Sequence, residues 1–408
     1  MSYATARLTV AAFRSVGINA ELAPDSDGDT LELGGLHSGG EECLPHRITL
    51  GDFLKVCRQP GFDPNKVAFF MPKAEGPCRF GQYAPYLRQV LKELGYPEVL
   101  VVSPTSADAY DGIGEHASEL MHTVWMGIVA ADVMSRFLLK TRPYEKNPGD
   151  TDACFRQSLE ILAEVLSTPD LTHDQRVSRL ARAVEHCRDL FRAVSANYVK
   201  GRPLIGLVGE IFCRLNTFSN EDLARRIEKL GGECWLSDTP EWVWYTNWCR
   251  ESEIIRREGR LNRTFLKQKI KSHIQHRYEQ RLLAPVMADF KGYEEPHDVR
   301  EVLDASWRYL PGTGSLGEMV LSVGKAIYLY HKGADGVVDI SPFTCMNGII
   351  CEAVYPAVSA DCDDMPIRVC YFDKATTKLD RDLEIFLDLA RAYQRRKRHQ
   401  RVYPDYFK

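Results

Sequence analysis

The sequence lacks several patterns that would assign a function directly. It has no C-x-x-C pair, which excludes the zinc-ribbon and thioredoxin signatures. No apolar run approaches the roughly 20 residues that a membrane span needs, and the first residues, interrupted by Arg7 and Arg14, do not form a secretory signal. The net charge of −4 gives no reason to propose nucleic acid or an anionic membrane as a partner. We therefore expect a cytoplasmic protein.

Nucleotide-binding motifs are also absent or weak. No G-x-x-x-x-G-K-[ST] motif occurs, so a P-loop is excluded. The run from Gly312 to Gly317 matches G-x-G-x-x-G, but no clear apolar strand precedes it and no acidic residue follows at the right distance. We read it as a glycine-rich loop in which Ser315 caps the next helix, and we expect this chain to bind no nucleotide.

Cysteine, by contrast, is abundant, with twelve residues in a chain of 408. In the cytoplasm these thiols should be reduced. Most should be small core residues, which is the usual place of a free cysteine, and a few could be metal ligands or nucleophiles. Because there is no C-x-x-C pair, any cysteine site has to be assembled from distant segments.

Strand and helix patterns alternate at both ends of the chain. In the first part, strands are predicted at 18–24, 67–71 and 98–104, helices at 4–17, 49–57 and 79–95, and a glycine-rich loop at 27–46. In the last part, strands are predicted at 202–210, 233–238, 335–341 and 367–373, and helices at 219–232, 317–333, 346–358 and 380–398. Such alternation indicates parallel, doubly wound sheets.

The middle of the chain is helical. Apolar residues recur at three- and four-residue spacing over 117–140, 152–166 and 172–199. We therefore predict an α/β protein in three parts: an N-terminal α/β domain at 1–112, a helical layer at 113–200, and a C-terminal α/β domain at 201–408 with a helical insertion at about 240–310.

Three cysteines share one local context. Cys78 and Cys345 each follow a predicted strand and open a predicted helix, and Cys43 lies just ahead of a helix. Ligands of parallel sheets bind beyond the carboxyl ends of the strands. A helix N-terminus at that edge should lower the pKa of a thiol and donate N–H groups to its sulfur. Three such thiolates could hold zinc with an open fourth position or an iron–sulfur cluster, and their spacing does not decide between the two.

Four segments of the chain carry a family likeness. They are ECLPHRITLGDFLK (42–55), FFMPKAEGPCRFGQY (69–83), GRPLIGLVGEIFCRLNTFSNEDLARRIEKLGGECWL (201–236) and GADGVVDISPFTCMNGIICEAV (333–354). With them the chain resembles the 2-hydroxyacyl-CoA dehydratase component family (2-hydroxyglutaryl-CoA dehydratase D-component-like), and most closely the branch found fused to, or beside, the dehydratase activases. The likeness covers nearly the whole chain and is specific in the cysteine-bearing segments.

The resemblance implies two flavodoxin-like or Rossmann-like parallel-sheet domains joined by a helical layer. It also implies a [4Fe–4S] cluster in the interdomain cleft, held by Cys43, Cys78 and Cys345, with one iron free for a substrate or small ligand. A separate iron–sulfur activase would hydrolyse ATP and deliver one low-potential electron. In the dehydratases that electron forms a ketyl radical on an acyl-CoA and the hydroxyl group leaves, whereas relatives with a double-cubane cluster reduce small molecules.

This sequence departs from the family pattern in several places. The chain opens on a helix where the family usually has a strand: either the start is misassigned, or the strand is lost, or a neighbouring chain supplies it. Thr344 and Asn347 stand where Gly and Pro are usual. Cys213 replaces another residue, and Cys351 lies six residues after Cys345. Cys213 and Cys351 are candidates for extra ligands of a double-cubane cluster; the alternative that we favour is core packing.

Polar residues near the predicted strand end at 209–220 complete the candidate set. Glu210, Arg214 and Asn216 could line the cleft, where they would bind substrate or donate hydrogen bonds to cluster sulfur. Alternatively, Arg214 pairs on the surface. Of the eleven histidines, His46 beside Cys43 is the one positioned to matter; the default alternative is a solvated loop residue.

The sequence thus favours an oxygen-sensitive, cytoplasmic iron–sulfur protein that accepts electrons from an ATP-dependent activase. It would act as the dehydratase (lyase) or reductase component of an anaerobic system. Expected partners are the activase, a homologous subunit or second copy of the chain, and an acyl-CoA or another small substrate. Two alternatives stay open: a non-catalytic regulatory or structural subunit of an activase complex, and a zinc-binding α/β protein.

Overall fold

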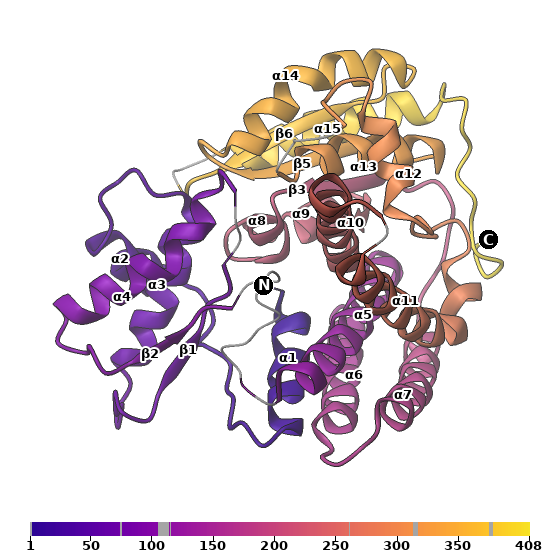
Figure 1. Cartoon of the computed structure of the whole chain (residues 1–408). Coiled ribbons are helices and arrows are strands. Elements are labelled where there is room, and N and C mark those ends of the chain that lie inside the picture. Colours follow the sequence, from indigo (N-terminus) through magenta and orange to yellow (C-terminus); the bar gives the residue numbers. More distant parts are fainter. Residues whose placement is uncertain are drawn as a thin grey trace.

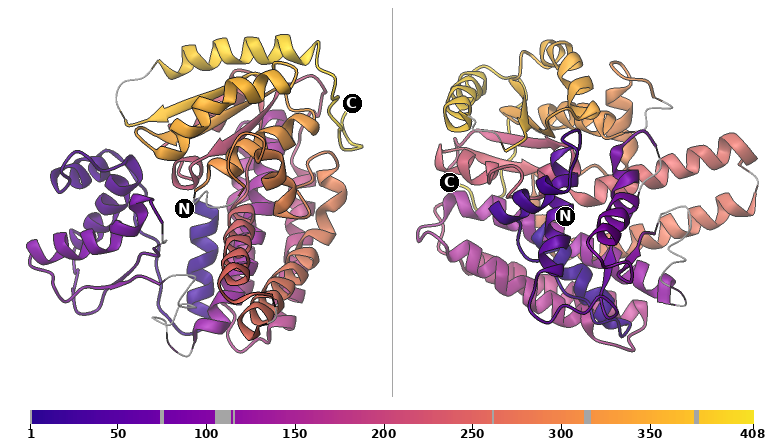
Figure 2. Two further views of the ribbon diagram at one scale, coloured as in Figure 1. Left: turned by 45° about the horizontal axis from the view of Figure 1, so that its top comes forward. Right: turned by 90° about the vertical axis from the view of Figure 1, so that its left-hand side faces the viewer.

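The structure, a computed structural model, describes residues 2–73, 76–104, 114, 116–260, 262–312, 317–374 and 378–408. It is a mixed α/β protein with two parallel sheets and three visible parts: a small lobe, a helical layer and a large lobe (Figure 1). Figure 2 shows the small lobe standing to one side of the other two parts. Within these ranges, no helix is both long and apolar enough to cross a membrane. The proposed cap at Ser315 lies outside the described residues.

The small lobe contains the shorter sheet. Its elements are α2 (Gly28–Leu36), α3 (Leu44–Cys57), β1 (Ala68–Phe70), η1 (Arg79–Gln82), α4 (Tyr83–Glu93) and β2 (Leu100–Val102). The two strands pair in parallel, with Phe69 opposite Val101. An apolar cluster that includes Leu54, Leu87 and Leu91 fills the space between strands and helices. The strands expected at 67–71 and 98–104 and the helix expected at 79–95 are therefore confirmed.

Two expectations for this region are wrong. Residues 18–27 form no strand, because a strand needs a paired neighbour and the described sheet here consists of β1 and β2 alone. The glycine-rich stretch at 27–46 is not all loop, because α2 forms within it. Asp27 and Thr30 build a capping box at the start of that helix, which satisfies backbone N–H groups that would otherwise lack acceptors.

Glycine in α2 serves a close helix contact. A Cβ at Gly34 would lie 2.0 Å from the backbone oxygen of Arg47, and a Cβ at Gly51 would lie 1.9 Å from that of Thr30. The backbones of α2 and α3 therefore approach to a distance that only glycine permits. This contact holds the helix that begins directly after Cys43.

We predict that Gly34→Ala lowers the free energy of unfolding by roughly 1–3 kcal/mol, because the added methyl group meets backbone atoms that cannot move aside. Gly35→Ala is the matched control on the same helix, since its Cβ would meet only the flexible end of Arg47, at 3.2 Å. The control should be neutral or gain up to about 1 kcal/mol from helix propensity. Urea unfolding of both variants checks this, and equal effects would contradict the packing argument.

The helical layer is built from long amphipathic helices. They are α1 (Tyr3–Ser15), α5 (Ala117–Thr141), α6 (Asp150–Ser167) and α7 (His173–Ala193), followed after the first part of the large lobe by α10 (Thr239–Glu258) and α11 (Arg263–Leu283). The short helix α12 (Val299–Ser306) packs on α13 (Met319–His331) of the large lobe. Short 3-10 helices lie at η3 (Arg142–Tyr144) and η4 (Ala284–Phe290). Residues Ala4, Leu8 and Ala11 of α1 share an apolar cluster with α5 and α6. The first helix therefore packs with the helical layer, while the domain boundaries stay a prediction.

The large lobe contains the second sheet. Its elements are β3 (Leu204–Gly209), α8 (Ile211–Leu215), α9 (Leu223–Lys229), β4 (Glu233–Leu236), α13 (Met319–His331), β5 (Gly336–Pro342), α14 (Met346–Asp361), β6 (Ile367–Phe372) and α15 (Leu379–Gln394). The strands are parallel in the order β4-β3-β5-β6, with Ile205 opposite Gly336 and Gly209 opposite Ile340. The chain turns back across the sheet between β3 and β5, which is the position where ligands of open α/β sheets bind.

Both faces of this sheet are covered. Leu204 and Val208 of β3 lie in the apolar cluster that contains residues of α13 and α14, whereas Ile205 and Leu207 lie in the cluster with α9 and α15. This alternation is the period-two pattern of a strand. All four strands and the helices predicted around them in this part of the chain are confirmed.

Candidate metal centre

The three cysteines singled out from the sequence differ from most of the others in accessibility. Eight of the twelve are buried, and the remaining four are Cys43, Cys78, Cys249 and Cys345. No disulfide forms among them. A core role explains the buried eight, but it does not explain thiols that stay accessible at strand–helix junctions.

Each of the three thiols sits at the N-cap of a helix. Cys43 caps α3, Cys78 caps η1 and Cys345 caps α14. The Cys78 sulfur accepts a hydrogen bond from the N–H of Phe80 at 3.4 Å, and the Cys43 sulfur lies 2.9 Å from the hydroxyl of Tyr83. Unpaired N–H groups at a helix start are suitable partners for a thiolate. The local context predicted from the sequence is therefore confirmed for all three.

The three caps converge on one carboxyl group, that of Glu210. Its charge raises the pKa of Cys43, of Cys78 and of Cys345, although the desolvation of each thiol is the larger cause. Cys43 acts on the pKa of Cys78 in the same way. Electrostatic effects of this kind require proximity, so segments separated by up to about 300 residues in the chain meet at this point.

An apolar contact brings the lobes together there. Leu44 and Ile48, on the first turns of α3, belong to the same buried cluster as Cys213 and Ile340 of the large lobe. On the large-lobe side, Gly209 ends β3 with a φ of +114°, a conformation open to glycine. The backbone N–H of Glu210 then bonds to the Ile340 oxygen at 2.8 Å. This turn places Glu210 directly after β3, beside the last residues of β5.

The expectation of lowered thiol pKa values is wrong for the free thiols. Desolvation, together with the charge of Glu210, raises the pKa of Cys345 to about 12. Hydrogen bonds from the N–H groups of Gly348 and Asn347 lower this pKa, but by less. The pKa values of Cys43 and Cys78 are raised as well, with desolvation again the largest cause. Helix N–H groups alone do not offset the loss of water, so a stable thiolate here needs a cation.

The spacing of the sulfur atoms bears on what cation that could be. In the described part of the chain, no three cysteine sulfurs lie within 4.8 Å of one another. Ligands of one tetrahedral zinc ion, each bonded at about 2.3 Å, would lie about 3.8 Å apart. The three thiols are therefore too widely spaced to bind a single zinc ion without rearrangement. A larger inorganic group would need a smaller movement of the thiols toward one another.

The turn before Cys345 contains a residue with a positive φ. The N–H of Cys345 bonds to the oxygen of Pro342 at 3.0 Å, which closes a four-residue turn. Thr344, the third residue of that turn, has a φ of +66°. Turns with a positive φ at this position favour glycine, so a β-branched residue here is strained.

We predict that Thr344→Gly raises the free energy of unfolding by about 0.5–1 kcal/mol. The substitution removes a backbone strain of roughly 1–2 kcal/mol from the folded state, because glycine adopts a positive φ without a clash. The greater conformational entropy of glycine in the unfolded chain cancels only part of this gain. Thr344→Ala keeps the Cβ and should gain less. Thermal unfolding of the two variants distinguishes them, and an equal gain would show that the backbone conformation is not the cause.

His46 has a different environment from the default one. It is not a solvated loop residue, because it is 5% exposed in α3 with its ring edge-on to Tyr83 and Tyr86. Burial lowers its pKa.

Asn216 contacts both its own turn and a distant segment. Its Oδ1 accepts the N–H of Ser219 at 2.7 Å, and its amide nitrogen donates to the hydroxyl of Ser26 at 3.5 Å. Its role in lining a cleft stays a prediction.

The two candidates for extra ligands are both core residues by position. Cys213 is fully buried in the cluster around the large sheet, and Cys351 is 1% exposed on α14. Cys213 nevertheless lies near the site, because the charges of Glu210, Cys345 and Cys43 act on it, after desolvation, to raise its pKa. Its packing agrees with the core alternative.

Arg214 does not pair on the surface. It is 7% exposed, and its Nε has no hydrogen-bond partner. Three carboxyl groups lie near enough to sense its charge: the buried Glu318 and Asp339 and the half-buried Glu210. Burial raises the pKa of Glu318 to about 8, with Glu210 as the next cause. Sequence reasoning missed Glu318 and Asp339, since one carboxylate in an apolar pattern carries no signal of its own.

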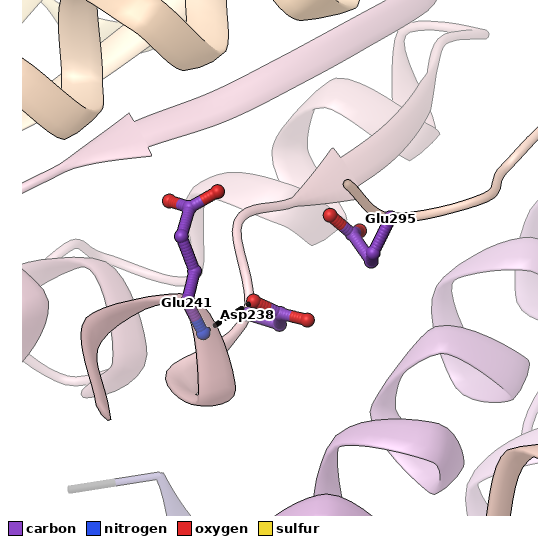
Figure 3. Close-up of side chains that lie close together, drawn as sticks. All are labelled: Asp238, Glu241 and Glu295. Atoms are coloured by element: carbon purple, nitrogen blue, oxygen red, sulfur yellow. Dashed lines mark hydrogen bonds between the residues drawn. The ribbon is translucent and has the colours of Figure 1, made fainter. Parts of the chain in front are cut away.

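A second polar group lies at the end of the edge strand β4. Asp238, Glu241 and Glu295 each offer an oxygen within 4.8 Å of the others (Figure 3). The ammonium of Lys325, fully buried, already contacts two of them, with Glu241 at 2.9 Å and Glu295 closer still. These carboxylates therefore have an internal cation, and the arrangement is a buried ion-pair network.

We predict that Lys325→Met lowers the free energy of unfolding by about 3–5 kcal/mol, because it leaves buried carboxylates without a counter-charge. Lys332→Met is the control, since its ion pair with Glu294 is part-exposed and should contribute less than about 1 kcal/mol. Urea unfolding measures both. A Lys325→Met protein as stable as the control would argue that the carboxylates bind another cation.

Comparison of the chain with protein-family models and with curated proteins finds no match in either.

Proposed function

We propose that this chain is an iron–sulfur protein of the 2-hydroxyacyl-CoA dehydratase component type. Its two parallel sheets would be the cores of two flavodoxin-like domains. In the larger sheet, the order β4-β3-β5-β6 matches the first four strands of the flavodoxin order 2-1-3-4-5. The observation that supports the proposal is that three helix-capping cysteines, distant in the sequence, each lie near enough to Glu210 to sense its charge.

The donor set fits such a group. Cys43, Cys78 and Cys345 would hold a [4Fe–4S] cluster. When bound, the cluster supplies low-potential electron transfer and one iron without a protein ligand. The chain's own contribution is to stabilise the ligating thiolates: Tyr83 lies within hydrogen-bond distance of one sulfur, and Phe80 donates its N–H to another. Burial of the surrounding carboxyl groups limits water at the site.

Electrons would come from a partner, an ATP-dependent activase, since no P-loop occurs in this chain. Around Cys345, the side chains of Phe343, Met346 and Ile349 are 57%, 41% and 54% exposed. An apolar rim of this kind suits contact with another protein. The chain would act in the cytoplasm as a dehydratase or reductase component, and a double-cubane cluster would need ligands beyond the three thiols.

Iron and acid-labile sulfide per chain, measured after anaerobic purification, test this proposal. The wild-type protein should contain both, with the broad visible absorption of an iron–sulfur cluster. Cys43→Ser, Cys78→Ser and Cys345→Ser should each lose most of the iron, because each removes one of the proposed ligands.

Cys249→Ser is the matched control, since Cys249 is the one other cysteine that is not buried. It should keep its iron. An iron-free wild-type protein, or one that contains zinc instead, would overturn the proposal. Loss of iron from the Cys249 variant equal to that of the other three would remove the assignment of ligands.

A further inference from the structure

Arg214 is the one arginine in the core whose side chain has no partner among the described residues. Three arginines are buried there: Arg176, Arg214 and Arg401. Arg176 donates to the backbone oxygens of Leu166 and Thr168 at 2.7 and 2.8 Å. Arg401 pairs with Glu233 at 2.7 Å.

The Nε of Arg214, by contrast, is buried without a hydrogen-bond partner, and no carboxylate of a described residue lies within 4 Å of the guanidinium. An arginine side chain keeps its charge in a protein interior and carries five N–H donors in a planar fork. Leaving such a group unpaired is costly, and a site that binds an anion would account for that cost.

The neighbouring carboxyl groups do not supply the missing partner, because each is already used. Glu210 accepts the N–H groups of Phe212 and Cys213, at 3.0 and 2.8 Å. Glu318 accepts the N–H of Ile211 with both oxygens, at 3.1 and 3.2 Å.

Asp339, the third carboxyl group, accepts the hydroxyl groups of Tyr355 at 2.6 Å and Ser341 at 3.1 Å. The three acids thus lie near enough to sense the charge of Arg214, but their hydrogen bonds go to other groups. Arg214 is therefore an unpaired cation in a polar site.

We propose that Arg214 is a ligand-binding residue of this site, whose guanidinium binds the carboxylate of a small organic acid. The planar fork of arginine matches a carboxylate with two parallel hydrogen bonds. A phosphate dianion carries two negative charges, and the single charge of one arginine would leave one of them unbalanced in a largely buried site. The site therefore selects a singly charged, planar anion. The inference rests on the proposed function for its place in a reaction, but the binding itself needs only the protein chain.

Thermal unfolding with acetate or inorganic phosphate as the probe, at constant ionic strength with chloride as the balance, tests this inference. Acetate at ten or more times its dissociation constant should raise the wild-type midpoint by about 2 °C, and phosphate should raise it less. Arg214→Met should abolish the acetate shift. Arg214→Lys should retain a smaller shift, because an ammonium lacks the planar fork.

Arg277→Met is the control, since the side chain of Arg277 is 59% exposed, and it should keep the full acetate shift. Without added anions, Arg214→Met should unfold at the same temperature as the wild type or higher, because it removes an unpaired buried charge. An acetate shift that survives in Arg214→Met, or is absent from the wild type, overturns the inference. So does a clear loss of stability in Arg214→Met, which would show that Arg214 is a structural residue.

The two proposals fail separately. A wild-type protein that contains iron but shows no Arg214-dependent acetate shift loses only the carboxylate site. A protein that lacks iron but shows this shift loses the cluster and keeps Arg214 as an anion-binding residue.

Discussion

Contact between the first turns of α3 and the large lobe is the constraint on which the candidate site depends. Leu44 and Ile48 share a buried apolar cluster with Cys213 and Ile340, and Leu44 directly follows the cap residue Cys43. Burial of apolar side chains is favourable but has no directional preference. It therefore holds the two lobes close together but does not orient the polar groups between them. The helix starts add local direction, because each of the three cysteines occupies an N-cap position, where unpaired backbone N–H groups lie close by. Only the sulfur of Cys78 accepts a capping hydrogen bond, from the N–H of Phe80.

The electrostatics of the site follow from that closure. Once the lobes meet, the three thiols and three carboxyl groups are partly shielded from water, and desolvation is the largest cause of every raised pKa among them. Groups of this kind become anions only when positive charge is near. Arg214 carries such a charge beside the carboxyl groups, Arg79 carries one near Cys43, and the proposed cluster would bring more. The Lys325 network differs from this site, because its carboxylates already contact an ammonium group within the chain. It therefore needs no ligand to balance its charge.

Much of the fold could be predicted from sequence, because it depends on local periodicity. The long helices α5, α6 and α7 and the strands of the large sheet have uninterrupted apolar patterns, and all were found where expected. Prediction failed where a local pattern is ambiguous. The glycines of α2 suggested a loop, but they serve close contact with α3. The short pattern at 18–24 suggested a strand, but it has no partner strand.

The sequence by itself determined which thiols stand at helix starts, since the change from strand to helix pattern at Cys78 and Cys345, and the helix that follows Cys43, are local features. Only the tertiary structure decided what surrounds them. The burial of His46 and Arg214, the approach of Glu318 and Asp339, and the upward direction of the thiol pKa values all come from segments far apart in the chain. Desolvation and charge act between residues that are close in space but distant in the sequence. The amino-acid sequence therefore does not show which side chains will exclude water from one another.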